Sequence, residues 1–333
     1  MGDVLSVKVE ALDRFELVGE SVWSDLHARS AAPVPFLSWP WQNLWWENFA
    51  EGRALKILCV SDSSGETVGL LPLYEREAGL WQLVGGVDIS DYLDLLAVRG
   101  SEEEVWSGLL HHRAGEPDAW DLHCLPAASP TVSILPALAP AFGLHALARR
   151  EERCPVLALP GSWDGYLGRL SGKDRHELRR KLRRLERQWP DATVRSHAAP
   201  AGLEAAMTAF LALHRKSKAG KARFMDVRME GFFRRVASAL AARGWLRLWF
   251  LEGDGTAVAS YLCLEFTGSV ALYNSGFDPS HASLSPGIVL LCHVISDAIE
   301  RGFARFDFLR GEEPYKYALG AVSEEIFNVV VAP

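Results

Sequence analysis

Short apolar runs separated by turn residues predict strand pairs at two places in the chain. Residues 55–60 and 67–74 flank a polar turn, which is the pattern of a β-hairpin. Residues 245–251 and 256–266 flank a turn that contains Asp254-Gly255, a pair that suits the positive φ angles of tight hairpin turns. The sequence therefore predicts two hairpins that lie far apart in the chain.

The same order of elements follows each hairpin, namely a third strand, a loop, a helix and a further strand. In the first half these are a strand at 80–84, a helix from Ser101 and a strand at 120–125; in the second half they are a strand at 269–275, a helix at 285–301 and a strand at 303–309. An order of strand, strand, strand, loop, helix, strand that occurs twice indicates internal duplication.

The boundary between the two copies is marked by prolines at positions 126, 130, 136 and 140, which resist a continuous helix or a central strand. We therefore predict domains at residues 1–150 and 151–333. A chain of 333 residues is long enough for each domain to bury its own core. Predicted helices at 201–218 and 229–243 precede the second hairpin, so helices and strands alternate as in an α/β layered fold.

Composition narrows the class of protein. Hydrophobic residues make up 49% of the chain and charged residues 23%, which is typical of a folded globular protein. No stretch reaches 18 uninterrupted apolar residues and the N-terminus lacks a basic start, so we expect no membrane span, no secretion and a cytoplasmic location. The five cysteines and the histidines lack ligand-like spacing, so no metal site is expected.

Four short motifs in the second half carry a family resemblance. They are Tyr273-Asn-Ser-Gly-Phe-Asp278, Ser285-Pro286-Gly287, Phe306-Asp307-Phe308 and Gly311-Glu-Glu-Pro-Tyr315-Lys316. Together with the element order, they resemble the CelD-like acetyltransferases, relatives of the Fem peptidoglycan aminoacyltransferases. Both groups pair two GNAT domains. The resemblance implies an α/β fold with two GNAT-like halves in tandem, each a mixed, mostly antiparallel twisted sheet flanked by helices, and an acyltransferase activity.

GNAT enzymes hold the pyrophosphate of acyl-CoA on backbone N–H groups where a loop enters a helix. By this resemblance Ser285, Pro286 and Gly287 form the donor site, since serine caps helices, proline suits the first helical position and glycine admits a phosphate. The corresponding helix of the first half begins Ser101-Glu102-Glu103-Glu104, a capping box whose carboxylates repel phosphate. The usual glycine-rich phosphate loop is absent before Ser285, so aminoacyl-tRNA stays open as a donor.

Acyl transfer needs a base for the acceptor's proton and a positive group where the carbonyl oxygen becomes negative. The resemblance to Fem enzymes implies that Lys316 faces the acyl group, the alternative being a surface lysine. Asp307 is either a general base or a partner of Lys316 or Arg310. Tyr273 and Tyr315 either donate a proton to the leaving thiolate or pack in the core.

Residues 173–187 form a predicted amphipathic helix with eight basic and three acidic residues. The basic face is either solvated or binds an anion, because arginine suits phosphate and carboxylate groups. As candidate anion-binding or acceptor-binding residues we take Arg175, Arg179 and Arg183, together with Lys218 from a predicted loop. The anion is CoA, a nucleotide-linked sugar, a lipid phosphate or tRNA.

Three functions follow from these patterns. The first is an N-acyltransferase that moves an acetyl or longer acyl group from acyl-CoA, without a metal, to a small-molecule or nucleotide-linked amine such as a cell-surface polysaccharide precursor. The second is transfer of an amino acid from aminoacyl-tRNA to a cell-wall precursor. The third is a catalytically silent GNAT-like protein that binds RNA or another polyanion. The sequence lacks the glycine motifs of NTPases and dinucleotide-binding enzymes and the Gly-x-Ser-x-Gly motif of hydrolases.

Overall fold

The computed structural model describes residues 7–333, so the first six residues of the predicted N-terminal domain lie outside the described range. The chain divides into two compact units. The first extends through Glu152 and also contains Glu324–Pro333, and the second is Arg153–Ser323. The sequence did not indicate that the last ten residues return to the first unit.

The first unit contains a mixed sheet in the order β1-β2-β3-β4-β6-β13-β7, with β5 paired to β3. Its strands are β1 (Lys8–Leu12), β2 (Leu55–Ser61), β3 (Thr67–Glu77), β4 (Leu80–Leu83), β5 (Leu96–Ala97), β6 (Ala119–Pro126), and parts of β7 (His145–Ala158) and β13 (Val322–Ala332). The pair β4–β6 is parallel, whereas β1–β2, β2–β3, β3–β4 and β6–β13 are antiparallel. The predicted hairpin of 55–60 and 67–74 is confirmed as β2–β3.

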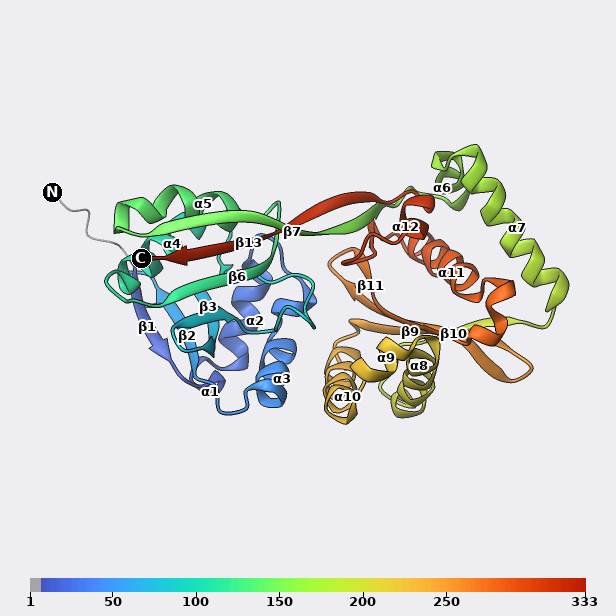
Figure 1. Ribbon diagram of the computed structural model, residues 1–333, viewed down its shortest axis with the longest axis horizontal. Coiled ribbons are helices and arrows are strands. Elements are labelled where there is room, and N and C mark those ends of the chain that lie inside the picture. Colours follow the sequence, from blue (N-terminus) through green and yellow to red (C-terminus); the bar gives the residue numbers. More distant parts are fainter. Residues whose placement is uncertain (1–6) are drawn as a thin grey trace. The chain divides into compact units, whose positions relative to one another are not determined.

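Helices cover both faces of this sheet, with α4 and α5 on one face and α2 and α3 on the other (Figure 1). The helices are α1 (Phe15–Val18), α2 (Glu20–Arg29), η1 (Pro35–Leu37), α3 (Trp39–Phe49), α4 (Glu102–Arg113), α5 (Pro130–Leu138) and η2 (Ala139–Phe142). Large aromatic side chains fill the space between the layers, and Trp23, Trp41, Trp106 and Trp120 are almost fully buried.

Two local predictions for the first unit were wrong. The proline-rich segment after β6 forms α5 and η2, because Pro130 occupies the first helical turn, where the missing N–H costs nothing, and Ser129 caps the helix by accepting from the Thr131 amide. Pro136 lies inside this helix. Ser101 does not form the predicted capping box, since its hydroxyl donates to the carbonyl of Val98 instead.

The second unit contains a sheet in the order β7-β12-β11-β10-β9-β8. Its remaining strands are β8 (Thr193–His197), β9 (Leu246–Gly253), β10 (Thr256–Phe266), β11 (Ser269–Phe277) and β12 (Arg305–Asp307). All pairs except the parallel pair β11–β12 are antiparallel. The predicted hairpin is confirmed as β9–β10, and its turn residues Asp254 and Gly255 have φ angles of 51° and 73°. The predicted mixed, mostly antiparallel sheet is therefore present.

Two groups of helices flank the sheet of the second unit, with α8 and α10 on one face and α6, α7 and α11 on the other (Figure 1). The helices are α6 (Trp163–Arg169), α7 (Gly172–Gln188), α8 (Leu203–Ser217), α9 (Ala219–Phe224), α10 (Val227–Ala241), η3 (Pro279–Leu284), α11 (Pro286–Glu300) and α12 (Pro314–Ala318). The segment around Gly220, predicted as a loop, is the short helix α9. No helix within residues 7–333 has the length and apolar character to cross a membrane.

Candidate functional site

The central feature of the second unit is the point where β11 and β12 separate. Their parallel pairing covers only Ser269–Ala271 of β11 and Arg305–Asp307 of β12, yet β11 continues to Phe277. The register of β11 against β10 also shifts by one residue at Tyr273. A bulge of this kind bends a strand and redirects its side chains. Beyond Ala271, β11 is therefore no longer paired with β12. The candidate site lies where the two strands separate.

Lys221 of α9 reaches this part of β11. Its ammonium group donates to the carbonyl oxygen of Ser275 at 2.5 Å and to the Ser275 hydroxyl at 2.9 Å. Burial lowers the pKa of Lys221 to about 8, and the positive charge of Lys218 acts in the same direction while Glu313 opposes it. With two of three N–H groups engaged, the ammonium keeps one donor for another acceptor.

Beneath the same strand lies His214 of α8, which is 1% exposed. Burial lowers the pKa of His214 to about 4, with the nearby charge of Lys221 adding to the effect. Its ring is therefore neutral at pH 7, and Nδ1 has no hydrogen-bond partner among the described residues. Asn274 hydrogen-bonds to this histidine and also accepts from the Ser275 amide. Polar groups from α8, α9 and β11 thus meet at the bulge.

Asp307 is the last residue of β12, and its side chain binds the turn that follows the strand. Its Oδ1 accepts from the Leu309 amide at 2.8 Å and its Oδ2 accepts from Arg305 at 3.1 Å. Leu309 has a φ angle of 55°, which is uncommon for a leucine. The 3% exposed carboxylate therefore stabilises the turn that leads the chain away from β11.

Lys316 of α12 is also 3% exposed and binds the same turn. Its ammonium donates to the carbonyl oxygens of Leu309, Arg310 and Gly311 at 3.3, 2.9 and 2.9 Å, and it forms an ion pair with Glu313 at 2.9 Å. An ammonium group has three N–H donors, and these acceptors use all of them. Asp307 and Lys316 do not form the direct ion pair considered from the sequence. Instead, both side chains bind backbone groups of the turn that follows β12.

The predicted donor residues lie at the start of α11. Ser285 has a φ angle of 53° and a side chain that makes no capping hydrogen bond, so the expected serine cap is wrong. Pro286 occupies the first turn and is buried, and Gly287 accepts from the Tyr261 hydroxyl at 3.0 Å through its carbonyl oxygen. Because the Ser285 side chain does not cap the helix, it leaves the backbone amides of the first turn to another acceptor.

A cavity of about 270 Å³ lies beside this helix start, between α7, α11 and α12. Leu178 and Lys181 of α7, Ile288 of α11 and Tyr315 of α12 contribute to its lining, together with two acids of α7, Asp174 and Glu177. Burial raises the pKa of Tyr315 well above the usual value, so its hydroxyl stays protonated at neutral pH. Tyr273, the second predicted tyrosine, instead stacks on Phe233 with ring centroids 5.6 Å apart. Of the two tyrosines, Tyr315 is the one that lines the cavity.

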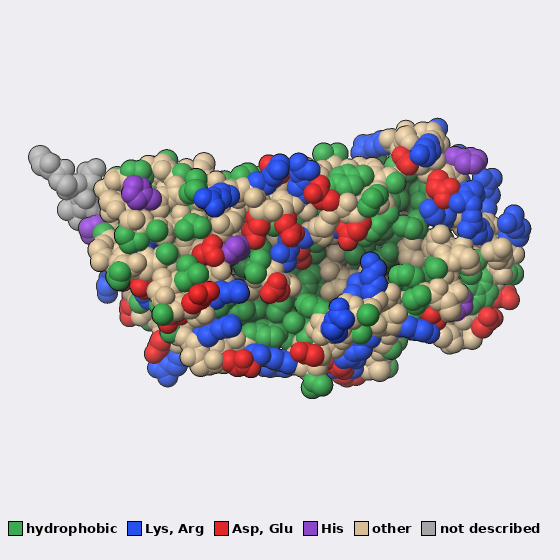
Figure 2. Space-filling view, in the orientation of Figure 1, with side chains coloured by type: hydrophobic (Ala, Val, Ile, Leu, Met, Phe, Trp, Pro, Cys, Tyr) green, Lys and Arg blue, Asp and Glu red, His purple; other side chains and the backbone are tan. Residues whose placement is uncertain are grey.

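The predicted basic helix is confirmed as α7, and Figure 2 shows Lys and Arg side chains gathered over it. Two contacts join it to the segment before α11: Arg184 donates to the Ser283 carbonyl oxygen at 2.7 Å, and Trp189 stacks on His281 at 5.2 Å. The charged face of α7 therefore lies next to the loop that enters α11.

The predicted anion-binding residues of α7 form a stripe that lies beside the residues of α7 that line the cavity. Arg179 and Arg183 are exposed, while Arg175 is half-buried and donates to the Leu167 carbonyl oxygen at 3.4 Å. The lysine of α7 that lines the cavity is Lys181, which was not singled out from the sequence. Lys218 precedes α9 and lies close enough to influence Lys221.

Several residues of this region were not singled out from the sequence as candidates, although some lie within the motifs or the basic helix described there. They are Lys181, His214, Lys221, Tyr261, Asn274 and Glu313. Lys221 lies three residues after the predicted candidate Lys218, and His214 is a lone histidine in a largely apolar helix. No group of three or more His, Cys, Asp or Glu residues within the described part of the chain is arranged to hold a metal ion.

Comparisons with known proteins give one family match and several similar folds. Residues 172–317 match the family described as Acetyltransferase (GNAT) domain. No curated protein matches the sequence. Among solved structures, FemX has a TM-score of 0.63 and 12% identity, covering 96% of both chains. A conserved protein of unknown function from Bacteroides thetaiotaomicron also has a TM-score of 0.63 and 12% identity, covering 98% of this chain and all of that one.

A third solved structure is the C-terminal domain of a putative lysylphosphatidylglycerol synthetase from Agrobacterium fabrum. It has a TM-score of 0.59 and 10% identity, covering 93% of this chain and 90% of that one. At such identities the likeness concerns the fold, and it confirms the predicted fold class, α/β with two GNAT-like halves. Residues 172–317 are therefore similar to a GNAT acetyltransferase domain, and the fold of the chain is similar to that of FemX.

Proposed function

We propose that the protein is an N-acyltransferase that transfers an acetyl or longer acyl group from acyl-CoA to an amine acceptor. The observation that carries this proposal is the separation of β11 from β12 beside the uncapped start of α11, in the segment that matches the GNAT domain. The separated strand offers backbone groups to the donor's pantetheine amides, and the helix start offers N–H groups to its phosphates.

The residues around α11 fit a phosphorylated donor. The first turn of this 15-residue helix contains no acidic residue, and Ser285 does not occupy its amides. Arg184 and His281 lie next to this start through their contacts with Ser283 and Trp189. The positive guanidinium of Arg184 reinforces the helix dipole in binding an anion at this end.

The first unit lacks these features, and we propose that it has an acceptor-binding or structural role without a donor site. Its corresponding helix, α4, begins with Glu102, Glu103 and Glu104, and Glu102 accepts from the Gly100 amide. Three carboxylates in the first turn repel a pyrophosphate group.

Three groups are suited to the chemical step. We assign the positive group that stabilises the tetrahedral oxyanion to Lys221, because it retains a free N–H donor, whereas all three donors of Lys316 are engaged. Tyr315 supplies a proton to the departing thiolate, since its hydroxyl is protonated and lines the cavity. Glu313, an exposed carboxylate beside Lys221, accepts the proton that the attacking amine loses.

The amine acceptor is proposed to be a small molecule or a nucleotide-linked sugar, as the resemblance to CelD-like acetyltransferases implies.

A second donor is favoured by one observation. Arg179, Arg183 and Arg187 leave an exposed basic stripe along α7 that is larger than one CoA requires. Such a stripe suits the phosphate backbone of aminoacyl-tRNA. Transfer of an amino acid to a cell-wall precursor is therefore the second candidate function.

Calorimetry distinguishes the two donors. Wild-type protein is titrated with acetyl-CoA, CoA and charged tRNA, and the same titrations are made on Gly287→Glu and Gly287→Ala. We expect acetyl-CoA to bind the wild type and Gly287→Ala, and to lose at least tenfold in affinity with Gly287→Glu, because the new carboxylate opposes phosphate. The alanine variant controls for the side-chain contact with Tyr261, whose hydroxyl lies 3.3 Å from a Cβ at this position. Binding of tRNA without binding of any CoA would select the second function.

A further inference from the structure

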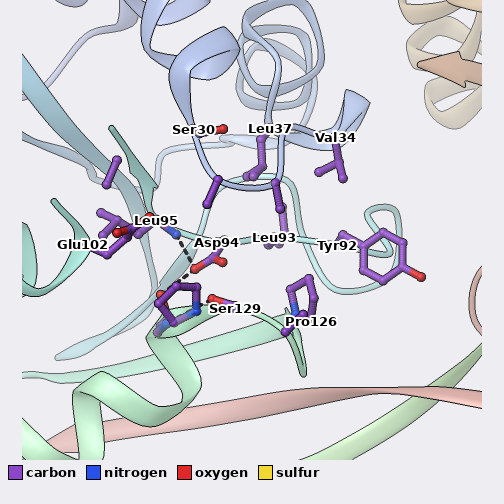
Figure 3. A pocket seen from close by; sticks show the side chains of 16 residues that line it. Ser30, Val34, Leu37, Tyr92, Leu93, Asp94, Leu95, Glu102, Pro126 and Ser129 are labelled. Carbon is purple, nitrogen blue, oxygen red and sulfur yellow. Dashed lines mark hydrogen bonds between the residues drawn. The ribbon is translucent and has the colours of Figure 1, made fainter. Parts of the chain in front are cut away.

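The first unit contains a cavity of about 240 Å³ that the acyltransferase proposal does not use. It lies between the segment after α2, the loop before β5 and the start of α5 (Figure 3). Most of its lining is apolar, including Val34, Leu37, Leu93 and Leu95. Two carboxylic acids, Asp94 and Glu102, complete the lining, and no lysine, arginine or histidine of the described residues contributes to it.

Asp94 projects between these walls, with Leu37 on one side and Ser129 on the other (Figure 3). Its Oδ1 accepts from the Leu95 amide at 2.8 Å and from the Thr131 hydroxyl at 2.7 Å. Thr131 in turn accepts from the buried Trp106 indole at 3.1 Å. This chain of hydrogen bonds fixes the carboxylate, so it has a single orientation at the cavity.

A fixed carboxylate in an apolar cavity is costly without a counter-charge. Burial raises the pKa of Asp94 to about 6, against the hydrogen bonds from Ser129, Thr131 and Leu95 that favour the charged form. Glu102 and Tyr92 are the other titratable side chains that line the cavity, and the charge of Glu102 opposes ionisation of Asp94 further. Asp94 is nonetheless mostly ionised at pH 7.5, so the cavity holds negative charge that no basic side chain of its described lining compensates.

The position of this cavity in the repeat adds to the argument. It adjoins the start of α4, as the cavity of the second unit adjoins the start of α11. Two acids line each cavity, but in the second unit Lys181 adds a positive charge to the lining, whereas here no basic side chain of the described residues does. The cavity of the first unit therefore differs from that of the second in having no basic side chain beside its two acids.

We propose that this cavity binds a small organic cation, a primary ammonium group carried on an apolar body. The ammonium pairs with Asp94, and the body lies against Val34, Leu37 and Leu95. This site is separate from the acyl-donor site and does not depend on the proposed acyl transfer. A cavity of about 150 Å³ holds benzene, so this larger one holds about ten non-hydrogen atoms.

The probe for this site is the phenethylammonium ion, and the neutral control is 2-phenylethanol, which has the same shape. Both are titrated by calorimetry at pH 7.5 into the wild type, Asp94→Asn and Asp88→Asn. Asparagine at position 94 keeps an oxygen acceptor for the Leu95 amide and removes the charge. Asp88 is an exposed acid of the same loop, so its replacement makes the same change in net charge away from the cavity.

We expect the cation to bind the wild type and Asp88→Asn at least tenfold more tightly than the alcohol does, and Asp94→Asn to remove this preference. Affinity for the cation should also fall between pH 7.5 and pH 5 as Asp94 becomes protonated. Thermal unfolding of each variant without ligand shows whether the unit is folded. Equal affinity for cation and alcohol, undiminished cation binding by folded Asp94→Asn, or no binding of the cation would each overturn the proposal. Loss of folding in Asp94→Asn leaves the wild-type comparison of cation and alcohol to decide.

Discussion

Gly276 of β11 lies against the backbone of His214 in α8, so closely that no side chain fits between them. A Cβ at position 276 would lie 2.8 Å from the Cα of His214 and still nearer to its amide nitrogen. Backbone atoms cannot move aside as a flexible side chain does. This contact sets the distance between α8 and the strand that carries Asn274 and Ser275.

Replacement of Gly276 by alanine is therefore expected to lower the free energy of unfolding by about 1–3 kcal/mol, as overpacking does. Urea denaturation followed by circular dichroism measures it. Gly231, inside α10, has room for a Cβ among the described residues, so Gly231→Ala is the matched control. It should raise stability by about 0.5–1 kcal/mol because alanine favours the helix. Equal effects at the two positions would contradict the close packing at Gly276.

The two buried lysines are predicted to have different roles. Lys221→Met should lower kcat about a hundredfold while changing the free energy of unfolding by less than about 1 kcal/mol, since it removes an oxyanion donor and a buried charge. Lys316→Met should lower the free energy of unfolding by about 2–4 kcal/mol, because buried carbonyl oxygens of the turn after β12 lose their donors. Steady-state kinetics and urea denaturation check both variants. A stable Lys316→Met enzyme with lost turnover would return the oxyanion role to Lys316.

Lys221 also predicts a pH dependence. The charged form is the one that stabilises an oxyanion, and the pKa of this lysine is lowered to about 8. The value of kcat/KM should therefore fall as pH rises through about 8, and Lys221→Arg should lack this descending limb because arginine stays charged. A pH profile of initial rates tests this. A rate that instead rises through about pH 8 would indicate that the neutral amine is the active form.

In the first unit, His123 is held between two carboxylates, Asp121 and Glu151, at 2.8 Å each. Burial works to lower its pKa, but the hydrogen bonds to Asp121 and Glu151 prevail and raise the pKa of His123 to about 9. The native state therefore binds its proton more tightly than the unfolded state does. The stabilisation is complete below about pH 6.5 and is lost as pH rises to about 9.

His123→Asn should accordingly destabilise the first unit by about 1–3 kcal/mol at about pH 6, with a difference from wild type that shrinks above about pH 9. Chemical denaturation at both pH values measures it. His112→Asn, at an exposed position of α4, serves as the control and should have little effect at either pH. A pH-independent cost of His123→Asn would mean that the ring packs as a neutral group.

The exposed arginines of α7 lead to a prediction that distinguishes aminoacyl-tRNA from acetyl-CoA as the donor. Arg179→Glu combined with Arg183→Glu should weaken binding of tRNA and make it less dependent on salt, by about one unit of log–log slope for each phosphate that the protein no longer neutralises. The affinity for acetyl-CoA should change by less than about threefold, because neither arginine lines the cavity beside α11.

Filter binding over a range of salt concentrations tests this difference between the donors. Arg14→Glu combined with Arg149→Glu is the control, since both positions are exposed, lie in the first unit and give an equal change in net charge. Unchanged tRNA binding by the α7 variant, or an equal loss in the control, would remove the support for the second donor.

The sequence predicted the features that depend on neighbouring residues. The turn at Asp254-Gly255 and the leucines of α7 act over a few positions, so the hairpin and the helix were found. Lys316 was found through its motif, but its role depends on where the chain turns after Asp307, which no local pattern encodes. The same is true of Lys221, which acquires its environment only because β11 extends beyond β12. Ser285 was misread because its left-handed conformation arises from the preceding helical turn η3.

The strand β13 has a consequence for how the protein is made. Its residues 326–331 pair with β6, and Val331 accepts from the buried Arg113 of α4. During synthesis, every residue of the second unit is therefore made before β13 is available to pair with β6 in the first unit. The second unit is able to fold while the first waits with an open sheet edge at β6, which exposes unpaired backbone to other chains. Chaperone dependence during synthesis should consequently belong to the N-terminal half.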